Sequence, residues 1–208
     1  MALRMAVLSL VVIGSKAFTA VAADMDRMVH IMVDASASFA QVDLAVAAAM
    51  RQIAPPPDMV FKVLRWDTDL VPSSEQDWTA QGLFQLEFPS RGGGTQLGQS
   101  LQELLAQSRQ AQETCTRVVI VVHGATSDEP VLRTALASAR PSDFIKLLMT
   151  PLEAPDEASD PMSVLGHYQK IIDGFAPRGT PSAEQFSVTA LDDALKAADE
   201  HRCLPQMM

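Results

Sequence analysis

One short segment places three oxygen donors at alternate positions directly after an apolar run. Residues 34–38 read DASAS, so that Asp34, Ser36 and Ser38 follow the apolar residues 28–33. A carboxylate with hydroxyl groups is an oxygen-only donor set that suits Mg²⁺, Mn²⁺ or Ca²⁺ better than Zn²⁺. The segment therefore indicates a divalent-metal site. The alternative is a helix start, because Ser38 is also a sound N-cap residue.

Two further segments carry side chains of related chemistry. Thr95 follows the three glycines of residues 92–94, and His123 directly follows the apolar run of residues 117–122. Asp128 stands five residues after His123. Neutral hydroxyl ligands leave most of a cation's charge unneutralised, so such a site would seek a further carboxylate from a partner or a substrate.

The elements that would position these residues follow from hydrophobic periodicity. Apolar runs predict six strands, at residues 28–33, 59–66, 83–88, 117–122, 144–149 and 186–189. Helical periodicity predicts helices at residues 39–53, 95–111, 128–140, 163–175 and 190–203, the second of them capped by Thr95. Residues 67–78 are polar and rich in turn formers.

Alternating strands and helices are typical of one class of fold. The pattern predicts a doubly wound α/β domain with a mostly parallel, six-stranded sheet and helices on both faces. Ligands of such Rossmann-like sheets bind outside the carboxyl ends of the strands. All three donor segments fall at that edge, so we expect them to converge.

The three segments resemble the von Willebrand factor type A (VWA) family, over nearly the whole chain after residue 28. That family carries a metal-ion-dependent adhesion site with the pattern Asp-x-Ser-x-Ser, a distant Thr and a distant Asp. Asp34, Ser36 and Ser38 match the first part of the pattern, and Thr95 with Gly98 close behind looks like the second loop. The resemblance implies a bound Mg²⁺ or Mn²⁺ ion.

The third loop departs from the family pattern. VVIVVHGATSD resembles the family's fourth strand and loop, but His123 occupies the usual Asp position, while Gly124 is kept. Imidazole is a softer ligand than carboxylate, so His123 disfavours Mg²⁺ and could favour Mn²⁺. Asp128 could substitute as a ligand from the same loop. The alternative is a degenerate site without metal, where Asp34 and the serines only cap a helix.

The first 23 residues have the order of a secretory signal peptide. A basic start and an apolar centre precede small residues at Ala20, Ala22 and Ala23. The alternative is a buried first strand at residues 5–13. With the signal peptide removed, residues 24–208 form a single VWA-like domain of the exported bacterial type, periplasmic or secreted.

The net charge argues against two kinds of partner, and the cysteine content predicts a disulfide. The net charge of -9 argues against nucleic acid or an anionic membrane surface as a partner. No second apolar segment is long enough for a membrane anchor. Cys115 and Cys203 both fall at the edge opposite the donor segments in the predicted topology, so we expect an intramolecular disulfide. Two free thiols are the alternative.

The family resemblance implies a protein-binding module rather than an enzyme. In this interpretation an acidic side chain of a partner protein completes the coordination of the cation. No nucleophile elbow, zinc-protease motif or phosphate-binding loop occurs in the sequence. Two alternatives remain. One is a metal-free scaffold in an envelope assembly, and the other is a metal-assisted hydrolase with His123 as general base.

Overall fold

The computed structural model of the chain describes most of the predicted domain. The described residues are 28–34, 48–53, 59–66, 70–72, 78–79, 95–150, 161–175 and 181–203. The predicted signal peptide, Ser36, Ser38 and the predicted strand at residues 83–88 lie outside them.

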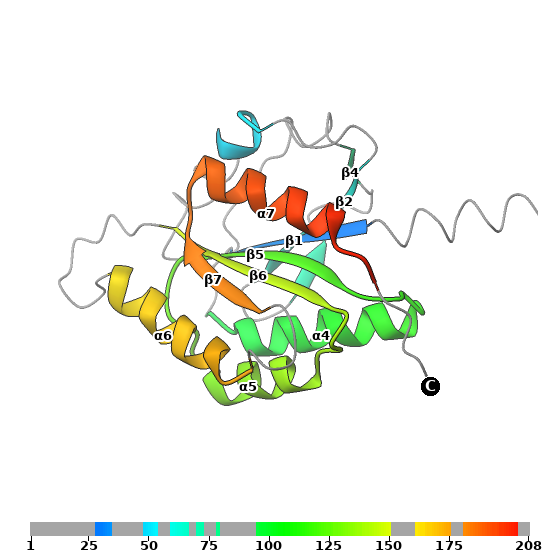
Figure 1. Cartoon of the computed structure of the whole chain (residues 1–208). Coiled ribbons are helices and arrows are strands. Elements are labelled where there is room, and N and C mark those ends of the chain that lie inside the picture. The colour runs from blue at the N-terminus through cyan, green and yellow to red at the C-terminus, as the bar shows by residue number, and fades with distance from the viewer. Residues whose placement is uncertain are drawn as a thin grey trace, which may run out of the picture.

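One mixed sheet runs through the described part of the molecule (Figure 1). Its seven strands lie in the order β3–β2–β1–β5–β6–β7, with β4 also paired to β2. The strands are β1 (Met28–Asp34), β2 (Val60–Trp66), β3 (Leu70–Pro72), β4 (Trp78–Thr79), β5 (Arg117–Val122), β6 (Phe144–Met149) and β7 (Ser182–Gln185). The five strands from β2 to β7 are parallel, whereas β3 and β4 are antiparallel to β2.

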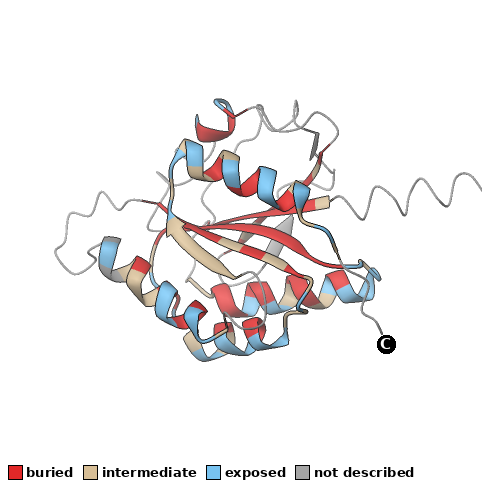
Figure 2. Ribbon diagram, viewed as in Figure 1, coloured by how far each residue is buried: buried red, intermediate tan, exposed pale blue. Residues whose placement is uncertain are grey.

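Hydrophobic sequence explains which strands are central. β5 reads RVVIVV, and all six of its residues are buried. β1 buries six of its seven residues. Strands that are buried on both faces need apolar side chains at every position rather than at alternate ones. Figure 2 accordingly shows both strands almost entirely in the colour of buried residues.

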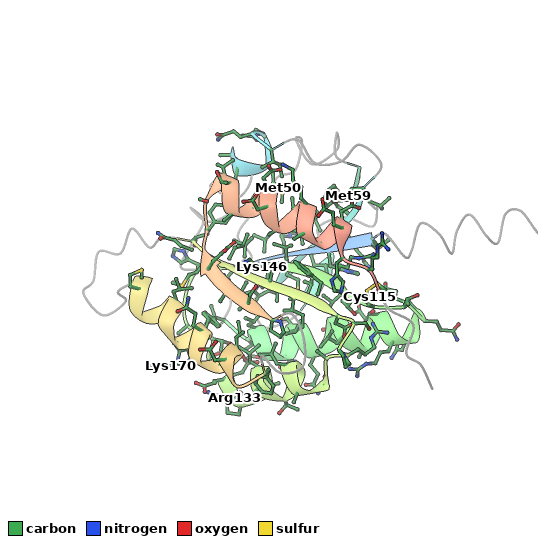
Figure 3. The ribbon with its side chains drawn as sticks, viewed as in Figure 1. Met50, Met59, Cys115, Arg133, Lys146 and Lys170 are labelled. Carbon is green, nitrogen blue, oxygen red and sulfur yellow. A yellow bond between two sulfur atoms is a disulfide. The ribbon has the colours of Figure 1, made fainter. Side chains whose placement is uncertain are left out.

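Helices cover the sheet from two sides. They are α4 (Leu97–Gln110), α5 (Glu129–Ser138), α6 (Pro161–Asp173) and α7 (Val188–Glu200), and residues 48–50 are also helical. One hydrophobic cluster combines α7 with Met50 and Met59. A second cluster contains the buried faces of α4, α5 and α6. Figure 1 shows α7 on one side of the sheet and the other three helices on the opposite side, and Figure 3 labels both methionines on the side of α7.

The chain leaves the two central strands toward opposite faces. After β1 it passes through residues 48–53, whose apolar side chains join the cluster of α7. After β5 it enters α5, which belongs to the other cluster. Because β1 and β5 are parallel neighbours, their carboxyl ends meet where the connections diverge. This is the position at which open α/β sheets form a ligand crevice.

The sequence-based prediction of strands needs two corrections. β3 and β4 lie in and at the end of the segment predicted to be turn-rich, residues 67–78, so the described part of the sheet contains two short strands that the sequence did not predict. The last strand is β7 and not residues 186–189. The side chain of Ser187 accepts a hydrogen bond of 3.0 Å from the Ala190 backbone N–H and starts α7 there. A serine N-cap outweighs the strand preference of its neighbours.

A disulfide joins two elements at the amino edge of the sheet. Cys115 and Cys203 are bonded, as the topology predicted, and they join the residue ahead of β5 to the end of α7 (Figure 3 labels Cys115). The Arg117 guanidinium reinforces this connection by donating from Nε and Nη2 to the His201 carbonyl oxygen at 3.1 and 3.0 Å. No helix among the described residues is long and apolar enough to cross a membrane.

Candidate functional site

Asp34 is the last residue of β1 and is buried at the carboxyl edge of the sheet. Its side chain is 1% exposed. The backbone N–H of His123, directly after β5, donates to Asp34 Oδ2 at 3.4 Å. The first and third donor segments therefore meet, as neighbouring parallel strands require.

Thr95 lies at the same edge, immediately ahead of α4. Its hydroxyl donates to the Ala125 carbonyl oxygen at 3.1 Å. Its own carbonyl oxygen accepts from the Ser127 backbone N–H at 2.8 Å and from the Ser127 hydroxyl at 2.9 Å. The second donor segment is thus attached to the loop between β5 and α5, residues 123–128, which we call the β5–α5 loop.

Asp128 closes this loop by binding the first turn of a different helix. Its two carboxylate oxygens accept from the backbone N–H groups of Gly98 at 3.0 Å and Gln99 at 2.8 Å. A carboxylate at the N-terminus of a helix is also favoured by the helix dipole. The prediction that Thr95 caps α4 is therefore wrong. Gln96 is the N-cap residue without a side-chain bond, and Asp128 satisfies the free N–H groups from the neighbouring loop.

Gly98 permits the close approach that these hydrogen bonds require. A Cβ atom at this position would lie 2.2 Å from the Leu132 backbone nitrogen and 2.7 Å from the Val131 carbonyl carbon. Both are backbone atoms of α5, which cannot move aside as a flexible side chain would. Gly98 therefore allows α4 and α5 to pack backbone to backbone beside the loop.

His123 points its ring toward the end of β6. Nδ1 lies 2.8 Å from the Thr150 hydroxyl, and that hydroxyl donates to the Val122 carbonyl oxygen at 3.2 Å. A hydroxyl has only one proton, so this network assigns a donating Nδ1–H to His123 and its ring lone pair to Nε2. Burial lowers the pKa of His123 to about 4, so the imidazole is neutral at neutral pH. A neutral ring whose second nitrogen is held by a hydrogen bond is the form that binds metals.

Tyr168 is a part of the site that the sequence did not reveal. This side chain of α6 is 0% exposed, and its hydroxyl donates to the Gly124 carbonyl oxygen at 2.8 Å. Burial raises the pKa of Tyr168, and the charges of Asp34 and Asp128 raise it further. The phenol is therefore protonated and donates its hydrogen to the loop. Only its position on the apolar face of the predicted helix hinted that it is buried.

The structure brings four of the six predicted ligands to one edge. Asp34, Thr95, His123 and Asp128 are connected through the β5–α5 loop, while Ser36 and Ser38 lie outside the described residues. Within the described part of the chain, no three His, Cys, Asp or Glu side chains form a group able to hold a metal ion. A cation at this edge would depend on hydroxyl donors, which suits a hard ion such as Mg²⁺ or Mn²⁺. The metal ligation of these residues stays a prediction.

Known proteins resemble this chain in structure but not in sequence. No protein-family model and no curated protein sequence matches it. The ArnB paralog VWA2 from Sulfolobus acidocaldarius is 12% identical with a TM-score of 0.52, over 82% of this chain and 44% of that chain. The von Willebrand factor type A structure from Catenulispora acidiphila is 14% identical with a TM-score of 0.52, over 85% of this chain and 42% of that chain. The chain has a VWA-like fold.

This VWA-like domain is also similar to a pilus protein. The pilus adhesin SpaC from Lactobacillus rhamnosus GG, in its open conformation, is 10% identical with a TM-score of 0.51, over 83% of this chain and 29% of that chain. The chain spans less than half the length of each of these three proteins. Similarity at such low identity shows the fold alone, so function has to be argued from the site.

Proposed function

We propose that this VWA-like domain is an exported protein-binding module that presents a divalent cation to an acidic group of a partner protein. One observation carries the proposal. Asp34 and Thr95 come from distant segments, yet both are hydrogen-bonded to the same β5–α5 loop at the carboxyl edge of the sheet. A loop that collects oxygen donors at this position is suited to binding a ligand.

The proposed ligands are the side-chain oxygens of Asp34, Ser36, Ser38 and Thr95. A bound cation would supply a positive charge with an open position for a carboxylate of the partner. The Thr95 hydroxyl donates its proton to the Ala125 carbonyl oxygen, which leaves the lone pairs of its oxygen available to a cation. Asp34 is the one carboxylate in this set, so we expect its charge to dominate the affinity for the ion.

His123 and Asp128 have different roles in this proposal. Asp128 supports the site by joining the loop to α4, because both of its oxygens already accept backbone hydrogen bonds. His123 is neutral, so the site lacks the second negative charge that the family pattern would place there. We therefore expect weaker binding of a divalent cation than a site with two carboxylates would show.

A periplasmic or extracellular location accords with this role. The disulfide between Cys115 and Cys203 supports an oxidising compartment, because such bonds are rare where thiols are kept reduced. Residues 1–23 have the order of a secretory signal peptide, which also supports export. We propose no catalytic activity.

Calorimetry with Mn²⁺ and Mg²⁺ tests the cation site. We expect wild-type protein to bind Mn²⁺ and Asp34→Asn to lose at least tenfold in affinity, because the variant keeps the shape of the side chain and removes the charge. Asp193→Asn is the matched control, since Asp193 is exposed on α7 and belongs to no part of the site. Mn²⁺ affinity that is equal in wild type and Asp34→Asn would refute the assignment.

A metal-free scaffold is the second candidate function. It is favoured by the engagement of both Asp128 oxygens with α4, which is a structural use of a predicted ligand. Capture of envelope proteins with the domain, with and without chelator, separates the two functions. A partner that is lost with chelator supports the cation site, whereas one retained equally in both conditions supports the scaffold.

A further inference from the structure

Three consecutive residues of the β5–α5 loop bind three different parts of the molecule. The His123 N–H donates to Asp34 at the end of β1, and the Ala125 carbonyl oxygen accepts from Thr95 ahead of α4. Between them, the Gly124 carbonyl oxygen accepts from Tyr168 of α6. Gly124 therefore lies between the residue that contacts Asp34 and the residue that contacts Thr95.

Tyr168 is fully buried in the core, so its packing can fix the position of Gly124. Its ring packs in the cluster of α4, α5 and α6, together with the buried residues Leu165, Ile171 and Ile172 of its own helix. A packed side chain can place its polar group accurately, and a hydrogen bond from a buried hydroxyl is costly to leave unmade. Gly124 itself offers no side chain for packing, so the carbonyl contact is the means by which α6 holds it.

We propose that Tyr168 is a positioning residue of the cation site, which holds Gly124 and thereby sets the placement of Thr95 relative to Asp34. This inference rests on the proposed function. Tyr168 does not touch the ion. It acts through the loop, as residues behind a metal ligand commonly do, and the loss of such a contact typically weakens metal binding 10–100-fold.

Removal of one oxygen atom tests the inference. Tyr168→Phe keeps the ring in the core and deletes the hydroxyl, so we expect Mn²⁺ affinity measured by calorimetry to fall about tenfold. Ser108→Ala is the matched control. Ser108 is also buried and accepts a hydrogen bond of 2.7 Å from the Thr116 hydroxyl, but at the opposite edge of the sheet. We expect it to leave Mn²⁺ affinity unchanged even if it lowers stability.

A double-mutant cycle distinguishes positioning from general loosening of the fold. If Tyr168 acts by placing Thr95, Tyr168→Phe should cost little further affinity once Thr95→Val has removed the hydroxyl. The same tenfold loss in both backgrounds would overturn the inference. Tyr168 is the single tyrosine of the chain, so 3-fluorotyrosine gives one fluorine resonance that reports on this contact. We expect Mg²⁺ to shift that resonance in wild type but not in Asp34→Asn.

The outcomes separate this inference from the proposed function. Wild-type binding of Mn²⁺ with equal affinity in Tyr168→Phe overturns the role of Tyr168 and leaves the cation site intact. No Mn²⁺ binding by the wild type overturns both. If Tyr168→Phe does not fold, the fluorine resonance of the wild-type protein gives the answer. A resonance that does not move when Mg²⁺ is added would show that Tyr168 is not coupled to the cation site.

Discussion

His123 shows how one side chain can serve both the fold and a binding site. The residue is 6% exposed, and its ring is hydrogen-bonded to Thr150, whose hydroxyl donates in turn to the Val122 carbonyl oxygen. Burial penalises the charged form, so the folded protein keeps the ring neutral. The sequence identified this residue as the departure from the family pattern. It could not reveal the Thr150 contact, which depends on the pairing of β5 with β6.

The neutral state of His123 predicts a loss of stability in acid. Its pKa falls from 6.5 to about 4 on folding, so the unfolded chain binds a proton more readily between these values. The contribution of His123 is complete above pH 6.5 and is lost as the pH falls toward 4. The loss reaches on the order of 3 kcal/mol. In urea denaturation with chelator, His123→Asn should gain stability relative to wild type by about this amount between pH 7 and pH 4.

The control for this measurement is a histidine on the surface. His167→Asn removes a side chain that is 38% exposed and lies 3.2 Å from Glu129. We expect this substitution to change stability little, because a contact between partly exposed polar side chains is weak. A His123→Asn variant that follows the wild-type pH profile would show that the folded protein does not hold this ring neutral.

At the scale of elements, the contact between α4 and α5 decides where the β5–α5 loop lies. Asp128 starts α5 and caps α4, and Gly98 lets the two backbones approach. We expect Gly98→Ala to lower the free energy of unfolding by about 1–3 kcal/mol or more, because the added methyl group meets backbone atoms. Chemical denaturation measures this loss.

A second glycine provides the comparison. Gly166 lies in α6, and a Cβ atom there would meet nothing within 4 Å. Gly166→Ala should therefore leave stability unchanged or raise it by up to about 1 kcal/mol, since alanine is the better helix former. Equal losses in both variants would mean that the close packing of α4 on α5 is not what makes Gly98 necessary.

The elements also show which features the sequence could predict. Apolar runs located β1, β2, β5 and β6, because burial on both faces leaves a continuous signal. The sequence suggests Thr95 as the cap of α4, but the first backbone N–H groups of α4 donate to Asp128, which lies on another element. Tyr168 was missed for the same reason. Its role depends on a contact 44 residues away in sequence with the Gly124 carbonyl oxygen, and a backbone oxygen carries no sequence signature.

At the scale of the whole molecule, the carboxyl and amino edges of the sheet have different roles. The carboxyl edge gathers Asp34, Thr95 and the β5–α5 loop, whereas the amino edge carries the disulfide and the Arg117–His201 contact. The buried Asp143 carboxylate adds to the amino edge by accepting from the Thr116 N–H at 2.7 Å and from Arg140 Nε at 3.0 Å. We infer that stability at one edge can be changed without changing the site at the other.

Removal of the disulfide tests this separation. Cys115 and Cys203 are 88 residues apart, so their bond restricts a long loop of the unfolded chain. The double variant Cys115→Ser/Cys203→Ser should lose about 3–5 kcal/mol of unfolding free energy in urea. Reductant should destabilise the wild type to a similar extent and leave the variant unchanged. Because the bond lies at the amino edge, the folded variant should retain wild-type affinity for Mn²⁺. A parallel loss of affinity would show that the two edges are coupled through α7 and the sheet.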